Sequence, residues 1–447
     1  MVLGTDRRVF ALAMARMADA LGNSFLIIVL PLYIASGQIA IDGLTGSQVL
    51  GFTLTEEFLI GLVLSLFGFL NSFGQPVTGR LSDRMGARKP FILGGLVVFG
   101  VASAAYPFVS SYAAVLLVRA FQGLGAAFTV PATVALVNDY AAGDRERGGN
   151  FGVFNTFRLI GFGFGPIVAG IVIAGGLGKE TITQYALGGF TLSGFNAAFS
   201  IAVLGAVVSF AMVTLLVDEP PRTDADAADD LSVNVLDPEG GLDTVFAVGV
   251  GTLFMALTIA LFATLQEPIN TALGQGSTLF GLQFSAVVAA NVLLQVPIGN
   301  WADEYGRRPF LVGGFALLAP AVLVQGLIPL FTASGTLTGP VLMLVARLLQ
   351  GVSVAMVFAP GLAIAGDLAG DSSGTTLSVL TMAFGLGIAF GPLVSGVLYS
   401  FSLLAPFAFG AALSVLALVL VVTQVEETLG TGAAPPESDE PPAVPQD

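Results

Sequence analysis

Long apolar stretches separated by short polar segments run through the whole chain. A helix needs about 20 mostly apolar residues to cross the hydrocarbon core of a bilayer. This pattern predicts twelve membrane-spanning helices, over residues 9–35, 56–78, 90–110, 112–138, 149–175, 190–217, 244–268, 278–300, 309–331, 338–366, 373–399 and 402–424. The first stretch is too long for a signal peptide and contains Arg16 and Asp19, so we expect it to be retained.

Two polar, acidic segments interrupt this pattern. Residues 218–243 and the chain after residue 430 are rich in Asp, Glu and Pro, a composition typical of flexible segments. We therefore predict a six-helix bundle over 1–217, a linker over 218–243, a second six-helix bundle over 244–429 and a disordered tail over 430–447. The expected fold class is an all-α membrane protein, with twelve transmembrane helices in two pseudo-symmetric six-helix bundles.

The composition supports a membrane protein and excludes several chemistries. Charged residues make up 10% of the chain, against about 25% in soluble domains. Because there is no cysteine and no histidine, disulfides, thiol catalysis and Cys/His metal sites are excluded, and proton chemistry would need carboxylates. Neither a serine-nucleophile elbow nor a phosphate-binding loop occurs, so we expect no enzyme activity and no cofactor. The net charge of −14 argues against nucleic-acid binding, and it fits either a salt-adapted organism or ordinary acidic tails.

Basic residues gather on one side of the predicted topology. That side contains Arg7, Arg8, Arg80, Arg84, Arg88, Lys89, Arg145, Arg147, Arg222, Arg307 and Arg308, whereas only Lys179 falls on the other. Loops rich in Lys and Arg remain in the cytoplasm. We therefore expect a multi-pass protein of the plasma membrane with both termini and the linker in the cytoplasm.

The two predicted bundles share an internal repeat. Five residues near the end of the second helix recur at a constant offset of 220 residues in the eighth: Asn71, Gln75, Gly79, Asp83 and Gly86 match Asn291, Gln295, Gly299, Asp303 and Gly306. Two shorter segments also recur, R-x-x-Q-G at Arg119 and Arg347 and G-x-x-x-G-P at Gly161 and Gly387. Parallel repeats of this kind place a substrate site between the halves, near the bilayer midplane.

The segment from Gly79 to Lys89 (GRLSDRMGARK) resembles the signature G-x-x-x-D-R-x-G-x-R-K of the major facilitator superfamily, and the resemblance extends over essentially the full chain. It implies a conformational latch, made of Gly79, Asp83, Arg84, Gly86, Arg88, Lys89 and Asp139 in the first half and of Gly299, Asp303, Gly306, Arg307, Arg308 and Asp367 in the second. Ala87 and Glu304 depart from the pattern and leave the pairing open. The alternative is that these charges only set the topology.

Two further features resemble the drug:proton antiporters of that family. Close to their glycine-rich motif are Gly161, Gly165, Pro166 and Gly170 in the fifth helix, with Gly387, Gly391 and Pro392 as counterparts in the second half. Small residues let helices pack closely, and tight packing alone is the alternative reading. The segment Asp19-Ala-Leu-Gly22 followed by Leu30-Pro31-Leu32 is similar to the start of tetracycline:proton antiporters, although the second proline of that pattern is missing.

Charged residues inside the spans are costly and therefore mark candidate functional positions. Arg16, Asp19 and Asn23 share one face of the first helix, and Asp19 lies ~15 Å into the span, near the midplane. We expect Asp19 to carry a proton or to contact a cationic substrate; the alternative is a permanent salt bridge to Arg16 or Arg158. The other candidates for the cavity are Arg119, Gln122, Arg158, Arg347, Gln350 and Glu267, the last of which also fits a solvated helix end.

These features predict a secondary active transporter that works by alternating access. The leading hypothesis is export of a small amphipathic or cationic compound in exchange for protons, with sodium as the other possible coupling ion. The excess of arginine in the cavity also fits uptake or facilitated diffusion of a sugar, organic anion or other metabolite. A non-transporting membrane sensor would usually add a large soluble domain. We expect the lipid bilayer, a small-molecule substrate and a coupling ion as partners, and a monomer.

Overall fold

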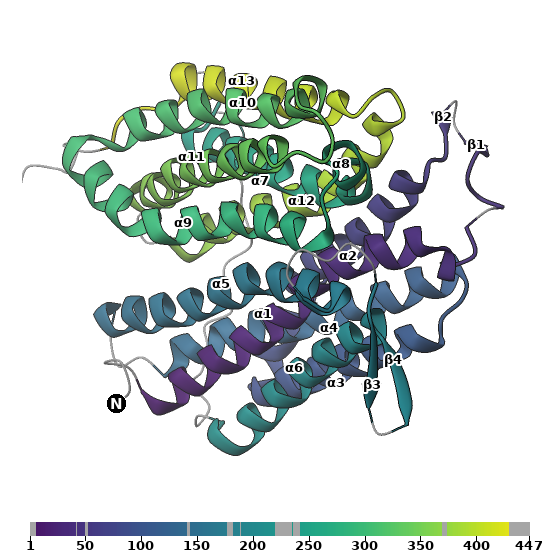
Figure 1. Cartoon of the computed structure of the whole chain (residues 1–447). Coiled ribbons are helices and arrows are strands. Elements are labelled where there is room, and N and C mark those ends of the chain that lie inside the picture. Colours follow the sequence, from purple (N-terminus) through teal and green to yellow (C-terminus); the bar gives the residue numbers. More distant parts are fainter. Residues whose placement is uncertain are drawn as a thin grey trace, which may run out of the picture.

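The structure is a computed structural model that describes residues 6–41, 43–49, 52–140, 144–176, 182–187, 189–219, 235, 242–368 and 373–428. Within these ranges, twelve helices are long and apolar enough to cross a membrane. They form two helical bundles, the second above the first in Figure 1, and this arrangement confirms the predicted fold class. Most of the predicted linker and all of the predicted tail lie outside the described residues.

The long helices follow one another in the same order in both bundles. The first bundle contains α1 (Arg7–Tyr33), α2 (Glu56–Met85), α3 (Lys89–Ala105), α4 (Tyr112–Asp139), α5 (Asp144–Ala174) and α6 (Gly194–Leu216). The second contains α7 (Thr244–Thr264), α9 (Ser277–Tyr305), α10 (Arg307–Phe331), α11 (Thr338–Leu368), α12 (Ser373–Tyr399) and α13 (Leu404–Gln424).

Short elements connect some of these helices. A π-helical turn, η1 (Ile34–Gln38), follows α1, a 3₁₀ turn, η2 (Tyr106–Phe108), follows α3, and the short helix α8 (Gln266–Leu273) follows α7. Two antiparallel hairpins pair β1 (Gln48–Val49) with β2 (Phe52–Thr53) and β3 (Gln184–Leu187) with β4 (Phe190–Ser193). Neither hairpin was expected from the sequence.

Several helix boundaries differ from the predicted spans. α2 continues through Met85, so the first part of the expected signature loop is helical. Gly86 caps the helix and has the left-handed φ of 57° that favours glycine. The predicted span 190–217 wrongly included strand β4. The predicted span 244–268 is interrupted at Leu265, so Glu267 belongs to α8 and not to the end of the seventh span.

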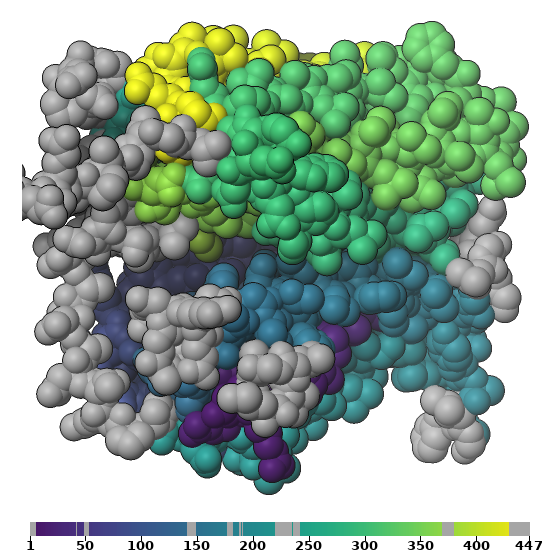
Figure 2. Space-filling view, turned by 90° about the vertical axis from the view of Figure 1, so that its left-hand side faces the viewer, coloured from purple at the N-terminus to yellow at the C-terminus, as the bar shows by residue number. Residues whose placement is uncertain are grey.

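The two ends of the molecule differ in charge and structure. Arg88, Lys89, Arg307 and Arg308 lie where α3 and α10 begin, and we call this the basic end. The two β-hairpins and α8 lie at the opposite end, which we call the hairpin end. The basic end is at the left of Figure 1, and Figure 2 views it directly, with the green and yellow second bundle above the first.

The two bundles pack against each other toward the hairpin end. At the α5–α9 seam, a Cβ atom added to Gly281 would lie 2.3 Å from the carbonyl oxygen of Pro166. At the α2–α12 seam, a Cβ atom on Gly61 would lie 2.3 Å from the carbonyl oxygen of Pro392. Only glycine allows backbones to approach this closely. From this contact α5 and α9 diverge toward the basic end (Figure 1).

Candidate functional site

A buried ion pair lies on α1, in the interior of a predicted span. Arg16 donates a hydrogen bond to the Asp19 carboxylate, and the two side chains are only 15% and 12% exposed. Arg158 of α5 lies within electrostatic range of Arg16, and its Nε donates to Asn155 Oδ1 at 3.0 Å. The fold therefore brings Arg16 close to two charged groups, the Asp19 carboxylate on α1 and the Arg158 guanidinium on α5.

A very small void lies beside Asp19, within the first bundle. Its volume is about 10 Å³, and residues of α1, α3, α4 and α6 line it. Three of them, Thr129, Thr133 and Ser209, carry hydroxyl groups. A space of this size holds about one water molecule. Each of these hydroxyl groups donates to a backbone carbonyl oxygen, Thr129 to Gly125, Thr133 to Thr129 and Ser209 to Ala15, so toward the void they can only accept hydrogen bonds.

Arg119 and Gln122 form a buried network with groups from α2, α3 and η2. Arg119 Nη1 donates to Gln122 Oε1 at 3.1 Å, and its guanidinium lies 4.4 Å from the ring centroid of Phe67. The Tyr106 hydroxyl donates to the same amide oxygen at 2.9 Å, and Gln122 Nε2 donates to Ser103 Oγ at 2.9 Å. Arg119 is 2% exposed, and its Nε has no partner among the described residues.

The second bundle repeats this network. Arg347 Nη1 donates to Gln350 Oε1 at 2.7 Å, and its guanidinium lies 4.2 Å from the ring centroid of Phe262. Gln325 of α10 donates to the same amide oxygen at 2.9 Å, just as Tyr106 donates to Gln122 in the first bundle. Neither buried arginine donates to a carboxylate in the hydrogen bonds found between described residues. In place of a carboxylate, each guanidinium has an amide oxygen and an aromatic face, both of which favour a cation.

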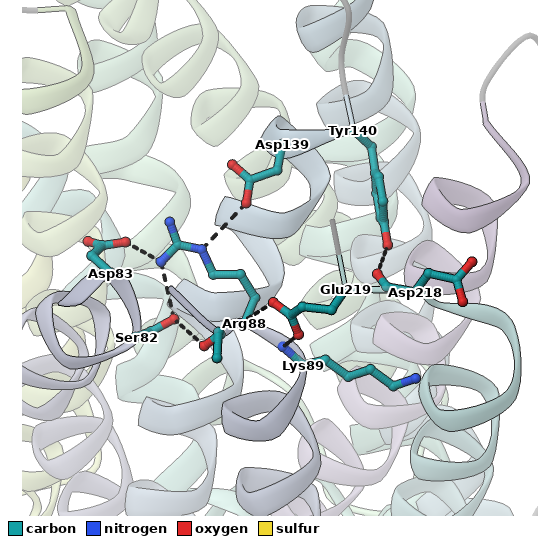
Figure 3. A network of polar contacts seen from close by, with 9 residues as sticks. Ser82, Asp83, Arg88, Lys89, Asp139, Tyr140, Asp218 and Glu219 are labelled. Atoms are coloured by element: carbon teal, nitrogen blue, oxygen red, sulfur yellow. Dashed lines mark hydrogen bonds and ion pairs between the residues drawn. The ribbon is translucent and has the colours of Figure 1, made fainter. Parts of the chain in front are cut away.

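Arg88 joins two carboxylates at the basic end of the first bundle (Figure 3). Its guanidinium donates to Asp83 of α2 and lies 3.5 Å from Asp139, the last residue of α4. Glu219, which follows α6, accepts hydrogen bonds from the backbone amides of Arg88 and Lys89. These amides begin α3 and have no acceptor within that helix, so the Glu219 carboxylate caps it.

Arg307 makes the equivalent contacts in the second bundle. It donates to Asp303 at 3.1 Å and also to Asp367. Glu427 accepts from the backbone amides of Arg307 and Arg308, both at 3.0 Å. The 220-residue offset aligns Arg307 with Ala87, yet Arg88, one residue later, makes the matching pair of contacts. Both ion-pair clusters lie within their own bundles in this conformation.

Other signature residues take different positions. Arg84 is exposed in the last turn of α2, and its counterpart Glu304 is exposed near the end of α9. Gly79 lies against α4, where a Cβ atom added to it would be 3.6 Å from Cβ of Pro131. Gly299 lies against α11 in the same way, with Ala359 at 4.0 Å.

The glycine motif has two kinds of contact. Gly161 and Gly165 pack α5 against α1, and Gly387 and Gly391 pack α12 against α7, so these four hold helices together within a bundle. Gly170 instead meets the start of α9 across the α5–α9 seam. Pro166 and Pro392 present their carbonyl oxygens to the two seams, as described above.

Two candidate residues remain, Asn23 and Glu267. The Asn23 side chain lies one turn from Asp19, and its buried Oδ1 has no partner among the described residues. Glu267 lies on α8 at the hairpin end and accepts a hydrogen bond from Thr271 at 3.2 Å. The sequence analysis missed Glu219 and Glu427, although acidic residues directly after the sixth and twelfth helices were a visible signal.

Tyr140 is a further group at the basic end that the sequence did not single out. It follows α4, and its hydroxyl donates to the carbonyl oxygen of Asp218 (Figure 3). Burial raises the pKa of Tyr140 to about 12, so the phenol stays protonated at neutral pH and keeps this hydrogen bond. The guanidinium of Arg8 lies over its ring, 4.4 Å from the centroid, which ties the start of α1 to the end of α4.

Twelve membrane-spanning helices in two equivalent bundles, with charged groups buried in both, define a polytopic membrane transporter. The comparisons with known proteins agree. The family model of the Major Facilitator Superfamily matches residues 12–241 and 246–445, and the chain belongs to this family.

The similar proteins include uncharacterised and characterised transporters. An uncharacterised MFS-type transporter of Methanocaldococcus jannaschii is 24% identical over 88% of this chain and 91% of its own length. The bacillibactin exporter of Bacillus subtilis is 28% identical over 37% of this chain and 39% of its own length. A bacterial homolog of the human lysosomal transporter Spinster, solved in an inward-facing and occupied conformation, shares the fold with a TM-score of 0.68 and 15% identity, covering 94% of this chain and 96% of that one.

Proposed function

We propose that this transporter exports a small amphipathic or cationic compound in exchange for protons, with Asp19 as the proton carrier. The position of Asp19 carries this proposal. Its carboxylate is buried in a membrane-spanning bundle, paired with Arg16, and adjacent to a void of water size lined by hydroxyl-bearing residues. The similarity to an exporter supports the direction of transport.

Proton exchange follows from the charges around this carboxylate. With Asp19 ionised, the Arg16–Asp19 pair has no net charge, and protonation of Asp19 leaves the pair with a charge of +1. A cationic substrate binds less well beside the protonated form, so substrate and proton compete. Moving one net charge through 100 mV provides about 2.3 kcal/mol, which supports a gradient of roughly 40-fold per net charge moved. Exchange of one proton for one monovalent cation moves no net charge, so the proton concentration gradient alone drives it.

The conformation fits a cytoplasm-facing state. We propose that the basic end faces the cytoplasm, because arginine and lysine are retained on that side of membranes. The glycine contacts at both seams then close the extracellular side. Both latch clusters make their contacts inside their own bundles, which supports the release of a latch between the bundles in this state.

Transport of an organic anion is the second candidate function. Arg119 and Arg347 favour it, since both are buried and each retains a donor without a partner among the described residues. An anionic group that reached either guanidinium would gain a charge-assisted hydrogen bond in a region of low dielectric constant.

Reconstitution in liposomes that contain a pH-sensitive dye distinguishes these functions. With an acidic interior, addition of lipophilic cations should trigger proton release through the wild-type protein and not through Asp19→Asn. Glu426→Gln removes an exposed carboxylate and serves as the matched control. Proton release that persists in Asp19→Asn contradicts the role of Asp19. Transport of organic anions without proton movement favours the second candidate.

A further inference from the structure

An open vestibule lies between the two bundles at the hairpin end. Its volume of about 530 Å³ falls in the range of small-molecule sites. The first bundle contributes residues of α1, α2 and α5, and the second contributes residues of α8 and the start of α9. The vestibule borders the α5–α9 seam, because its lining residue Ser277 donates to the carbonyl oxygen of Gly170 at 3.4 Å. The vestibule therefore has this shape only while the seam is closed.

Carboxylates from opposite bundles line this vestibule. Glu56 begins α2 in the first bundle, and Glu267 lies in the first turn of α8 in the second. Glu56 is within electrostatic range of both Glu57 and Glu267. No described residue that lines the vestibule is basic. Closing the seam thus brings like charges together, and a cation between them would offset the repulsion.

The other lining residues suit an organic cation. Leu32, Ile173 and Ile182 provide apolar surface from the first bundle, while Asn270 and Gln275 provide amide groups from the second. A bare Ca²⁺ ion needs 6–8 oxygen ligands. In the part of the chain that the structure describes, no group of three or more acidic residues could hold a metal ion. The volume and the mixed surface therefore favour a molecule with an apolar body and a positive charge.

We propose that the vestibule binds an organic cation between Glu56 and Glu267 while the seams are closed. Binding needs neither Asp19 nor a proton gradient. The bound cation stabilises the closed seams, so an organic cation supplied at the hairpin end holds the transporter open at the basic end. That this cation is the exported substrate, leaving by way of the vestibule, rests on the proposed function.

The test uses propidium, a fluorescent organic dication, and the full-length protein in nanodiscs of zwitterionic lipid. Saturable binding is expected for the wild-type protein. Either Glu56→Gln or Glu267→Gln should weaken it roughly three- to fivefold, the upper part of the range for a solvent-accessible ion pair. Glu57→Gln is the matched control. Glu57 is next to Glu56 but does not line the vestibule, so this variant should change the affinity less than twofold. Because Glu→Gln preserves side-chain size, melting temperatures should show that all three variants fold.

The outcomes separate this site from the proton-coupling proposal. Propidium binding that is lost in the Glu56 and Glu267 variants and preserved in Asp19→Asn supports the vestibule, whatever the transport assay gives. Equal affinity of the wild-type protein and the Glu56→Gln, Glu267→Gln double variant overturns the vestibule and leaves proton exchange untouched. A loss in Glu57→Gln as large as in Glu56→Gln also overturns it, because diffuse charge would then explain the binding.

Discussion

Replacing Gly281 by alanine should open the hairpin-end seam. The added Cβ atom would lie 2.3 Å from the Pro166 carbonyl oxygen, whereas ordinary contacts begin at 3.4 Å, so α5 and α9 must separate by about 1 Å. Overpacking of this kind costs about 1–3 kcal/mol. Since the overlap exists only while the seam is closed, the equilibrium should move roughly 5- to 160-fold toward the state that is open at the hairpin end.

Distances between spin labels measure this shift. The chain contains no cysteine, so introduced cysteine pairs are its only thiols. Leu44 and Leu337 are exposed residues of opposite bundles at the hairpin end. Leu81 and Tyr305 form the equivalent exposed pair at the basic end. In Gly281→Ala, double electron–electron resonance should show a longer Leu44–Leu337 distance and a shorter Leu81–Tyr305 distance than in the wild-type background.

Two control variants separate the seam from general effects of alanine. Gly94 has no neighbour within 4 Å of an added Cβ, so Gly94→Ala should leave both distances unchanged. Gly161→Ala would overlap the carbonyl oxygen of Met17 at 2.2 Å, inside one bundle, and should lower stability without shifting the two ends in opposite directions. Unchanged distances in a folded Gly281→Ala protein would refute the closed-seam interpretation.

Two further predictions concern the buried amide network and the helix caps. Gln122→Leu leaves the Tyr106 hydroxyl and the Arg119 guanidinium without their shared acceptor, which should cost about 1–3 kcal/mol and lower the apparent melting temperature in detergent; an unchanged melting temperature would contradict this role. Glu219→Gln keeps an acceptor oxygen but removes the charge at the start of α3, which should cost about 0.3–1 kcal/mol, and Glu427→Gln should have a similar effect on α10. A large effect in one bundle alone would argue against equivalent caps.

The sequence predicted the helices because each span is long enough to satisfy its backbone and to bury its apolar surface in lipid. The repeat likewise predicted that Arg119 and Arg347 have equivalent environments, since the spacing to Gln122 and Gln350 places each amide one turn away. The hairpins were not predictable, because strands of two to four residues give too short an alternation to separate from the neighbouring helices.

The contacts that could not be predicted are those between distant segments. Glu219 caps a helix whose first residues lie 130 positions earlier, and no local pattern links the two. The sequence shows that Arg88 lies one residue later than the position equivalent to Arg307. That Arg88 still reaches Asp83 and Asp139 depends on the backbone after α2, where Gly86 is left-handed. The partner of Asp19 was left open between Arg16 and Arg158, and the structure pairs it with Arg16 on the same helix, while Arg158 donates to Asn155.

The central claim is that a proton and the substrate compete at Asp19. The most direct test measures the affinity of the purified protein for a transported lipophilic cation as a function of pH. Proteins with Asp19 and with Asp19→Asn are compared, and both also contain Glu56→Gln and Glu267→Gln, which remove the vestibule site. The account predicts that wild-type affinity falls as the pH falls, while the affinity of Asp19→Asn is independent of pH. The same pH dependence in both proteins would contradict it.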